Sequence, residues 1–452
     1  MKPLNVVILA AGKGTRMYSS KPKVLHTLAG LSLVQHVLNS AAQLLPQNIV
    51  VIYGHGGDAV PLSLQATNAQ FVLQEPQLGT GHAVQQAMPH LSDGSQTLVL
   101  YGDVPLIQHT TLHKMQQAGS GLILLTVNME NPSGYGRIVR DAQHNVTCIV
   151  EEKDASDEIK LIQEVNTGIL LAPTLQLKKW LSALRTNNNQ GEYYLTDIVG
   201  MAVADGIPVQ TVQPTHEWEI HGINNKSQLA VLERTWQQVE AHRLLLQGVT
   251  LADPARLDVR GKLVCGRDVE IDVGCIFEES VTLGNNVQIG AYCIIKNSTI
   301  ADGTKVAPYS HIDSSIVGDK CLIGPYARLR PGTRLHADVH VGNFVEIKNS
   351  EIAQASKANH LSYIGDTTMG RRVNVGAGTI TCNYDGANKF RTIIEDDVFI
   401  GSDTQLVAPV TISRGSTIGA GSTITRNTPP DELTLSRSKQ MTINGWQRPK
   451  KK

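Results

Sequence analysis

The sequence predicts two domains of different classes, an α/β domain followed by a β-helix of hexapeptide repeats. At 452 residues the chain is longer than one hydrophobic core usually becomes. Short β-rich runs alternate with helical patterns up to about residue 225, and from about residue 250 apolar residues recur at every sixth position. A period of six fits neither a helix, with 3.6 residues per turn, nor a simple strand, with a period of two.

The first part of the chain has the alternation of strands and helices that is typical of a largely parallel sheet. Ligands bind such sheets at the carboxyl ends of the strands. Two loops with polar and glycine residues follow β-rich runs, one after Leu9 and one after Tyr101. The runs comprise residues 6–9, 49–53, 97–101 and 122–127.

The glycine-rich loop at residues 10–16 matches no standard nucleotide fingerprint. It lacks the Walker A spacing, and Met17 stands where the Rossmann pattern has its third glycine. Such a loop can be a tight connection only, but Arg16 and Lys23 beside it could neutralise phosphate charge. Asp103, after a later run, could hold magnesium or cap a helix. Both alternatives remain open from the residues alone.

A helix is predicted between the two domains. Leu229, Leu232, Trp236 and Val239 recur at helical spacing, and we expect this apolar stripe to serve packing. We predict an α/β domain at residues 1–225, a helical linker at 226–248, and the repeat domain with its C-terminal tail at 249–452.

The six-residue period predicts a parallel β-helix in which three hexads form one triangular coil. Each hexad would send one aliphatic side chain inward, and the period alone gives no handedness. Between Val375 and Ile394 the period slips by one residue, and residues 379–392 have the composition of a protruding loop. A β-helix can be a scaffold only, but loops that interrupt a solenoid often line a binding face. The three apolar series are Val259, Cys265, Ile271, Phe277, Leu283, Ile289 and Ile295; Ile323, Leu329, Leu335, Val341 and Ile347; and Ile394, Ile400, Leu406, Ile412, Ile418 and Ile424.

Composition favours small-molecule partners in the cytoplasm. Forty acidic and forty basic residues cancel, which gives no support for binding nucleic acid or a membrane surface. Six cysteines lie scattered without a CxxC pair, so we expect a reducing compartment without structural zinc or disulfides. The apolar run at residues 6–11 is too short to span a membrane.

His360 is a candidate general base in the repeat domain. It follows Lys348 by twelve residues, about two hexads, and lies near Tyr363. Acyl transfer to an amine needs a base that titrates near neutral pH, as histidine does. A single histidine is more often structural, so both interpretations stay open.

The N-terminal motifs resemble those of the sugar-phosphate nucleotidyltransferases. The signature LAAGKGTRM occupies residues 9–17, and the downstream Pro-Lys pair is residues 22–23. With its repeat half, nearly the whole chain resembles a family of bifunctional bacterial enzymes. Further matching motifs are QEPQLGTGHA (74–83), YGDVPL (101–106), GYGRI (134–138), EEKD (151–154), NTGI (166–169) and GINN (222–225).

The resemblance implies an α/β nucleotidyltransferase (Rossmann-like) domain and a left-handed parallel β-helix. It also implies two activities, acetylation of glucosamine 1-phosphate by acetyl-CoA and transfer of UMP from UTP to N-acetylglucosamine 1-phosphate. The product, UDP-N-acetylglucosamine, is a precursor of peptidoglycan and lipopolysaccharide. Mg²⁺ as cofactor and assembly as a homotrimer follow from the same resemblance.

The resemblance also assigns residues to the uridylyl-transfer site, which needs no protein nucleophile. Arg16 and Lys23 would bind and stabilise the phosphates, and Asp103 with Asn224 would hold Mg²⁺. The residues expected to contact nucleotide or sugar are Leu9, Ala10, Ala11, Gly12, Gln74, Gly79, Thr80, Tyr101, Gly102, Gly136, Glu151 and Asn166.

In the repeat domain the resemblance makes His360 the catalytic base. Asn359 precedes it where the family pattern has glycine, a departure that we expect to be tolerated. The residues expected at the sugar phosphate are Arg330, Lys348, Tyr363, Asn374 and Lys389. Those expected at acetyl-CoA are Ala377, Asn383, Tyr384, Ser402, Ala420 and Arg437.

Two other functions fit parts of the pattern. The chain could be a nucleotidyltransferase with one activity whose repeats only assemble or regulate it, although His360 and its neighbours argue against this. It could also be a non-catalytic assembly protein, although the joint presence of Arg16, Lys23, Asp103 and Asn224 argues against that.

Overall fold

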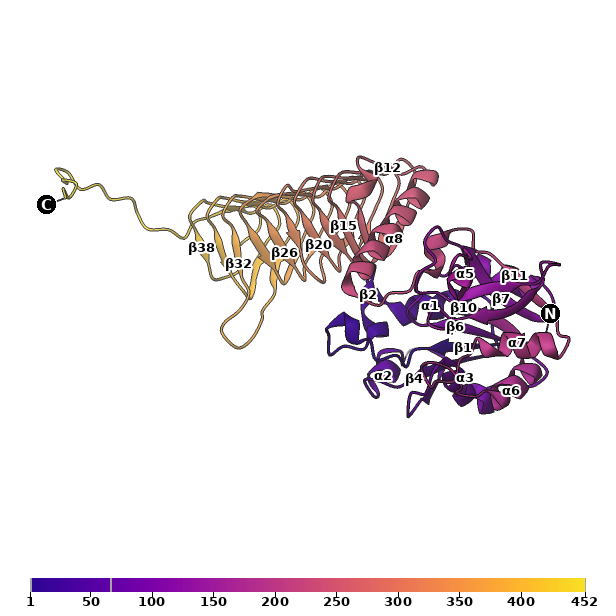
Figure 1. The fold of residues 1–452 in the computed structure, drawn as a ribbon. Coiled ribbons are helices and arrows are strands. Elements are labelled where there is room, and N and C mark those ends of the chain that lie inside the picture. The colour runs from indigo at the N-terminus through magenta and orange to yellow at the C-terminus, as the bar shows by residue number, and fades with distance from the viewer. Residues whose placement is uncertain (1, 66, 452) are drawn as a thin grey trace. The chain divides into compact units, whose positions relative to one another are not determined.

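The structure is a computed structural model that describes residues 2–65 and 67–451. The chain divides into two compact units, Met1–Trp236 and Gln237–Lys452, each with its own fold (Figure 1). The division falls within helix α8 (Lys226–Leu246).

The N-terminal unit contains a mixed sheet in the order β11-β7-β10-β6-β1-β4-β5. Neighbouring strands are parallel except where β10 pairs with β6 and β7, and β8 and β9 form an antiparallel hairpin beside β10. The prediction of an α/β domain with a largely parallel sheet is confirmed. The strands are β1 Leu4–Leu9, β4 Asn48–Tyr53, β5 Gln70–Leu73, β6 Gln96–Tyr101, β7 Leu122–Asn128, β8 Arg137–Arg140, β9 Val146–Val150, β10 Glu164–Pro173 and β11 Val209–Val212.

Helices bury both faces of this sheet. Along β1, Val6 and Ile8 pack with α1 and α4, whereas Val7 and Leu9 pack with α3, α6 and α7 on the other face. This burial explains why β1 is a continuous apolar run rather than an alternating one. The helices are α1 Leu33–Ala42, α2 Ala59–Ser63, α3 Thr80–Ala87, α4 His109–Gln117, α5 Asp157–Lys160, α6 Thr174–Ala183 and α7 Asp197–Ala204.

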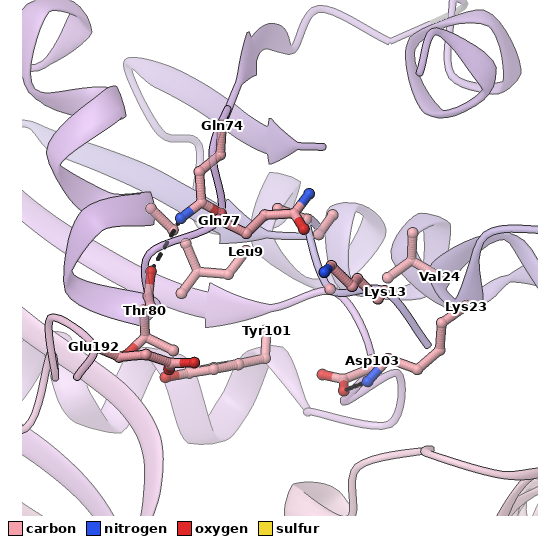
Figure 2. A pocket seen from close by; sticks show the side chains of 15 residues that line it. Leu9, Lys13, Lys23, Val24, Gln74, Gln77, Thr80, Tyr101, Asp103 and Glu192 are labelled. Carbon is pink, nitrogen blue, oxygen red and sulfur yellow. Dashed lines mark hydrogen bonds and ion pairs between the residues drawn. The ribbon is translucent and has the colours of Figure 1, made fainter. Parts of the chain in front are cut away.

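The parallel strands β1 and β6 end side by side, so their loops meet at one edge of the sheet. Leu9 pairs with Tyr101, and the Gly102 amide donates to the Leu9 carbonyl (2.9 Å). Leu9, Tyr101 and Asp103 therefore surround one pocket (Figure 2).

The C-terminal unit is a parallel β-helix with three short strands per coil (Figure 1). One sheet runs from β12 (Thr250–Leu251) to β39 (Leu433–Thr434), and a second sheet forms the other two sides. The prediction of a hexapeptide β-helix is confirmed. The coils that carry the candidate residues contain β23 Arg328–Leu329, β25 His340–Asn343, β26 Glu346–Lys348, β27 Glu351–Ile352, β28 Lys357–His360, β29 Tyr363–Gly365, β30 Thr367–Met369, β31 Asn374–Val375, β32 Ile380–Cys382, β33 Thr392–Ile394, β34 Phe399–Ile400, β35 Gln405–Val407, β36 Val410–Ile412, β37 Thr417–Ile418 and β38 Thr423–Ile424.

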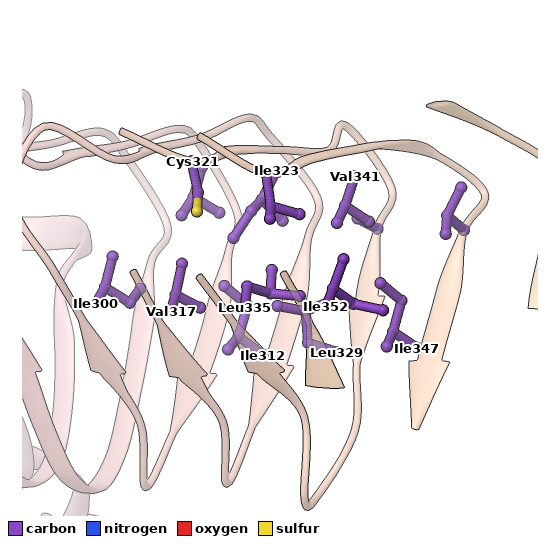
Figure 3. Close-up of a cluster of buried hydrophobic side chains, with 14 of the residues drawn as sticks. Ile300, Ile312, Val317, Cys321, Ile323, Leu329, Leu335, Val341, Ile347 and Ile352 are labelled. Atoms are coloured by element: carbon purple, nitrogen blue, oxygen red, sulfur yellow. The ribbon is translucent and has the colours of Figure 1, made fainter. Parts of the chain in front are cut away.

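The aliphatic residues of the hexads form the core of the solenoid (Figure 3). The core also includes side chains that are separated by five residues, such as Ile312 and Val317, or Ile347 and Ile352. Successive coils are thus offset by 17 or 18 residues, as in the pairs Tyr363–Ile380 and Gln405–Thr423. The three predicted series keep their six-residue period in this core, and the five-residue steps lie outside those series.

The predicted interruption is a loop between β32 and β33, which protrudes from the solenoid in Figure 1. It lengthens the offset, so that Thr367 pairs with Thr392 in the next coil.

The predicted apolar stripe of the linker helix is only partly buried. Leu232 is buried beside Leu229 and Trp236 in a cluster of the N-terminal unit, and Ala241 and Leu244 belong to the solenoid core. Val239 is 37% exposed, so its place in the stripe was wrong. Among the described residues, no helix is long and apolar enough to cross a membrane.

Candidate functional site

The first candidate site is a pocket of about 430 Å³ at the carboxyl edge of the N-terminal sheet (Figure 2). The loops after β1 and β6, the segment after β5 and the start of α3 form its walls. The structure brings together ten of the predicted residues there: Leu9, Ala10, Ala11, Gly12, Lys23, Gln74, Gly79, Thr80, Tyr101 and Asp103.

Gln74 is held in place by the protein itself. Its side chain is buried, and its Nε2 donates to the carbonyl of Gly79 (3.0 Å). Because its amide hydrogens face the protein, the Oε1 atom is the group that Gln74 can offer to a ligand.

Lys23 joins the residues that were expected to hold a metal. Its ammonium forms an ion pair with Asp103 and donates to Oδ1 of Asn224 (3.1 Å). The Ile223 amide donates to the carbonyl of Asp103 (2.9 Å), which fixes Asn224 beside Asp103 although the two lie far apart in sequence.

The oxygens of Asp103 and Asn224 converge on one ammonium, so both are within reach of a single cation. A carboxylate and an amide oxygen are ligands that Mg²⁺ accepts, and nucleotide phosphates usually complete its coordination. Among the described residues there is no group of three His, Cys, Asp or Glu side chains that could hold a metal without a ligand. The chemistry of these two donors fits a magnesium ion.

The glycine-rich loop packs against Lys23 at Gly14. Gly14 has a left-handed backbone (φ 61°), and a β-carbon there would lie 2.7 Å from Cβ of Lys23. Gly12 instead faces open space, with nothing within 4 Å of such a carbon. Arg16 lies on the 3₁₀ turn Thr15–Met17, where it is exposed and does not line the pocket.

The predicted sugar contacts form a second group next to Tyr101. The Asn166 amide donates to the Gly136 carbonyl (2.8 Å), and a β-carbon on Gly136 would lie 3.3 Å from Oε2 of Glu151. Thr196 donates to Glu151 (3.0 Å). Burial raises the pKa of the Glu151 carboxyl, and the Thr196 hydrogen bond offsets part of this rise.

Sequence reasoning missed several residues of the first site. Gln77 and Glu192 line the pocket beside the predicted residues, as do Lys13, Val24 and Ala83. Gln77 belongs to the quoted motif QEPQLGTGHA, but nothing in its spacing distinguished it from Gln74.

The second candidate site begins with His360, which ends β28 and is exposed. Its Nδ1 contacts Oδ1 of Asn343 (3.0 Å) at the same corner of the preceding coil. Since a carbonyl oxygen only accepts, the Nδ1–H group donates in this contact, and Nε2 is the nitrogen left for a ligand. Asn343 was not among the predicted residues, because it is seventeen residues from His360 in the sequence.

Three predicted sugar-phosphate residues lie on one sheet. Arg330 and Lys348 occupy equivalent positions of successive coils, and Tyr363 begins the strand of the next coil. Arg330 forms an ion pair with Glu346 (2.8 Å), a residue that sequence reasoning missed. Asn374 belongs to β31 of the other sheet, where it pairs with Lys357 of the preceding coil.

Predicted acetyl-CoA residues form a row along the corner that carries His360. Asp403 donates its amide to the Ala377 carbonyl (2.7 Å), and Gly421 donates to the Ser402 carbonyl (2.8 Å). The structure thereby aligns residues in successive coils, and the row ends where Nη1 of Arg437 donates to the carbonyl of Ala420 (2.7 Å).

The protruding loop carries the other predicted residues. Asn383 begins it, and an isolated antiparallel bridge joins Tyr384 to Lys389. The Phe390 amide donates to the Asn383 carbonyl (2.9 Å), so the loop closes on itself as a small hairpin.

Comparison with known families supports both halves of this description. A model of the MobA-like NTP transferase domain matches residues 6–158, and one of the GMPPB C-terminal domain matches residues 259–357. The bacterial transferase hexapeptide (six repeats) matches residues 391–426.

Individual relatives match almost the whole chain. The bifunctional protein GlmU of Azoarcus sp. (strain BH72) is 61% identical over 450 residues, which cover 99% of this chain and 100% of the relative. The bifunctional protein GlmU of Thiobacillus denitrificans is 62% identical over 448 residues, or 99% and 98% of the two chains. That of Herminiimonas arsenicoxydans is 61% identical over 450 residues, or 99% of each. Because identity is this high from end to end, the chain belongs to the family of the bifunctional protein GlmU.

Proposed function

We propose that the two units catalyse consecutive reactions of UDP-N-acetylglucosamine synthesis. The β-helix acetylates glucosamine 1-phosphate with acetyl-CoA, and the N-terminal unit then transfers UMP from UTP to the N-acetylglucosamine 1-phosphate formed, releasing pyrophosphate. As a member of its family, the chain is a bifunctional uridylyltransferase and acetyltransferase.

The observation that carries the uridylyl-transfer proposal is the contact of Lys23 with both Asp103 and Asn224 at the pocket wall. The sugar phosphate attacks the α-phosphorus of UTP in line, and pyrophosphate leaves. Asp103 and Asn224 would hold Mg²⁺, which would supply positive charge to neutralise the phosphates. Lys23 offers its ammonium to the phosphates, and because the protein positions the two substrates, no protein nucleophile is needed.

The other residues of this site have complementary roles. Arg16 binds phosphate from the exposed turn, Gln74 accepts a hydrogen bond from the uracil edge, and Glu151 and Asn166 bind sugar hydroxyls. The remaining nucleotide and sugar contacts are the predicted ones, including Gly102 and Gly136.

In acetyl transfer, His360 acts as general base. Nε2 accepts a proton from the amine of glucosamine 1-phosphate as the nitrogen attacks the thioester carbonyl of acetyl-CoA. The C–S bond then breaks, and CoA leaves as its thiolate, which takes up a proton. Asn343 holds the imidazole in the required tautomer.

Residues of the solenoid and of its protruding loop bind the two substrates. Arg330, Lys348 and Tyr363 bind the phosphate dianion together with Asn374 and Lys389. The residues proposed to bind acetyl-CoA are Ala377, Asn383, Tyr384, Ser402, Ala420 and Arg437.

We also propose the assignment of these activities to residues 1–225 and 249–452, with residues 226–248 as linker. Candidate residues spread over several coils favour sites that are shared between copies, and the homotrimer that the family resemblance implies is proposed for this chain. Six free cysteines fit a reducing compartment, so we propose that the enzyme acts in the cytoplasm.

A coupled assay tests the proposal. The chain is incubated with glucosamine 1-phosphate, acetyl-CoA, UTP and Mg²⁺, and we expect N-acetylglucosamine 1-phosphate, UDP-N-acetylglucosamine and pyrophosphate. Pyrophosphate formation only when N-acetylglucosamine 1-phosphate is supplied would indicate a single-function nucleotidyltransferase. The absence of both products would indicate a non-catalytic assembly protein.

A further inference from the structure

A buried carboxylate lies at the base of the protruding loop, between two asparagine side chains. Nδ2 of Asn349 donates to Oδ1 of Asp366 (2.5 Å), and Nδ2 of Asn383 donates to Oδ2 of the same carboxylate. Asp366 and Asn383 are each 8% exposed. We call these three residues the Asp366 cluster.

The backbone of Asp366 joins the same parts of the chain. Its amide donates to the carbonyl of Lys348 in the preceding coil (3.0 Å), and its carbonyl accepts from the amide of Thr392 (3.2 Å). Thr392 follows the loop and Asn383 begins it, so Asp366 binds both ends of the loop.

These contacts fix which end of the Asn383 carboxamide can meet a ligand. Its Nδ2 faces Asp366, whereas no hydrogen-bond donor contacts its Oδ1 among the described residues. That oxygen is also not among the fully buried polar atoms without a partner, so it reaches solvent. Asn383 therefore presents an acceptor.

The same carboxamide lies next to the substrate-binding candidate Tyr363. A β-carbon on Gly365 would lie 2.3 Å from the Tyr363 hydroxyl and 2.8 Å from Nδ2 of Asn383. Both side chains thus cover one glycine, which leaves room for them because it has no side chain.

We propose that Asp366 is a positioning residue for acetyl transfer. It orients Asn383 so that the Asn383 carbonyl oxygen accepts a hydrogen bond from an N–H group of the reacting substrates, the amine of the sugar or an amide of the pantetheine arm. This inference rests on the proposed acetyltransferase function. A carboxylate is suited to this role because it only accepts, so neither asparagine can turn its oxygen toward it.

Single truncations separate this role from a structural one. In Asp366→Ala we expect kcat/KM for acetyl transfer to fall by about 10- to 100-fold, because the Asn383 amide is no longer fixed. Asn349→Ala is the matched control, because it removes the other hydrogen bond of Asp366 but leaves Asn383 bound. An equal loss in Asn349→Ala would overturn the proposal, and uridylyl transfer should stay unchanged in both variants.

A reciprocal exchange gives a second test that does not depend on truncation. Asn383→Asp alone sets two carboxylates against each other and should lose acetyl transfer. In Asn383→Asp with Asp366→Asn, the new amide can donate to Asp at 383 and accept from Asn349, so an acceptor again faces the substrates. We expect at least a tenfold recovery over Asn383→Asp; no recovery would contradict the orienting role.

The outcomes also distinguish this inference from the function on which it rests. If the unaltered chain forms no N-acetylglucosamine 1-phosphate, the acetyltransferase function itself is wrong. If the unaltered chain is active and His360→Ala is not, while Asp366→Ala acetylates normally, only the inference about Asp366 fails.

Discussion

Gly14 and Lys23 are packed so closely that a β-carbon at position 14 would lie 2.7 Å from Cβ of Lys23. Gly14→Ala should lower the free energy of unfolding by about 1–3 kcal/mol, because it adds this clash to a left-handed backbone. Gly12→Ala is the control for stability, since nothing lies within 4 Å of its new carbon. Denaturant unfolding of both variants checks this, and equal losses would contradict it.

Lys23→Ala should reduce kcat of uridylyl transfer by about 100- to 1,000-fold, because it removes a cation proposed to stabilise phosphate charge. Acetyl transfer should stay unchanged. Lys13 lines the same pocket, and in the described part of the chain it forms no hydrogen bond or ion pair with Asp103 or Asn224, so Lys13→Ala should have a much smaller effect. Steady-state kinetics with both substrate pairs measures this, and comparable losses in the two variants would rule out the role of Lys23.

Asp103→Ala should raise the Mg²⁺ concentration needed for half-maximal uridylyl transfer, in addition to lowering the rate, because Mg²⁺ would lose its carboxylate ligand. The measurement is a magnesium titration of the uridylyl-transfer rate. An unchanged magnesium requirement would show that Asp103 does not bind the metal.

His360→Ala should lower acetyl transfer by about 100- to 10,000-fold, the usual contribution of a general base, and spare uridylyl transfer. Asn343→Ala should have a weaker effect, because it frees the imidazole to adopt the other tautomer without removing it. Separate assays of the two reactions check this, and full acetyl transfer in His360→Ala would exclude it as the base.

Replacing residues 384–389 with two glycines should abolish acetyl transfer but leave the β-helix folded. The strands on either side, β32 and β33, pair with β35 and β36 without help from the loop. Circular dichroism and uridylyl-transfer assays serve as controls. Loss of the β-helix signal would show that the loop is structural instead.

The N-terminal unit should become less stable at acid pH through Glu164. Burial alone would raise the pKa of its carboxyl, but hydrogen bonds from Arg140 (2.8 and 2.7 Å) and Thr126 hold it below the ordinary value of 4.5. The stabilisation is therefore present above pH 4.5 and is lost as pH falls through the lowered pKa. Arg140→Gln should cost about 1–3 kcal/mol near pH 7.

The pH dependence of unfolding checks that prediction. The difference in unfolding free energy between the unaltered chain and Arg140→Gln should shrink below pH 4.5. A difference that stays constant down to pH 3 would mean that the ion pair does not control the titration of Glu164.

The regular parts of the fold were predictable from the sequence because each follows from burial of a periodic apolar pattern. The continuous run that contains Val6 and Ile8 forms a central strand, and residues such as Ile400 and Ile418 mark the sides of the solenoid. The protruding loop was predictable because it breaks that period. The coils of 17 residues were not predictable, because a coil that is one residue shorter still has an apolar residue at each inward position.

The neighbours of the candidate residues were less predictable, because they meet only in three dimensions. The sequence does not reveal that Lys23 contacts Asn224, or that Asn343 lies beside His360 in the next coil. Asp366 is an ordinary polar residue in the sequence, and its two asparagine partners lie seventeen positions away on either side. Contacts of this kind depend on coil register, which the exact length of every intervening coil decides.

The corner residues Ala377, Ser402 and Ala420 lie in successive coils, so the spacing along this row is set by the spacing of the coils. Neighbouring strands lie about 4.8 Å apart, so each added or removed coil would lengthen or shorten the row by that distance. The inward side chains of the remaining coils would still stack on one another, so the packing of the core would stay the same. The number of coils therefore sets the length over which a bound molecule can contact this edge, whichever side chains line the row.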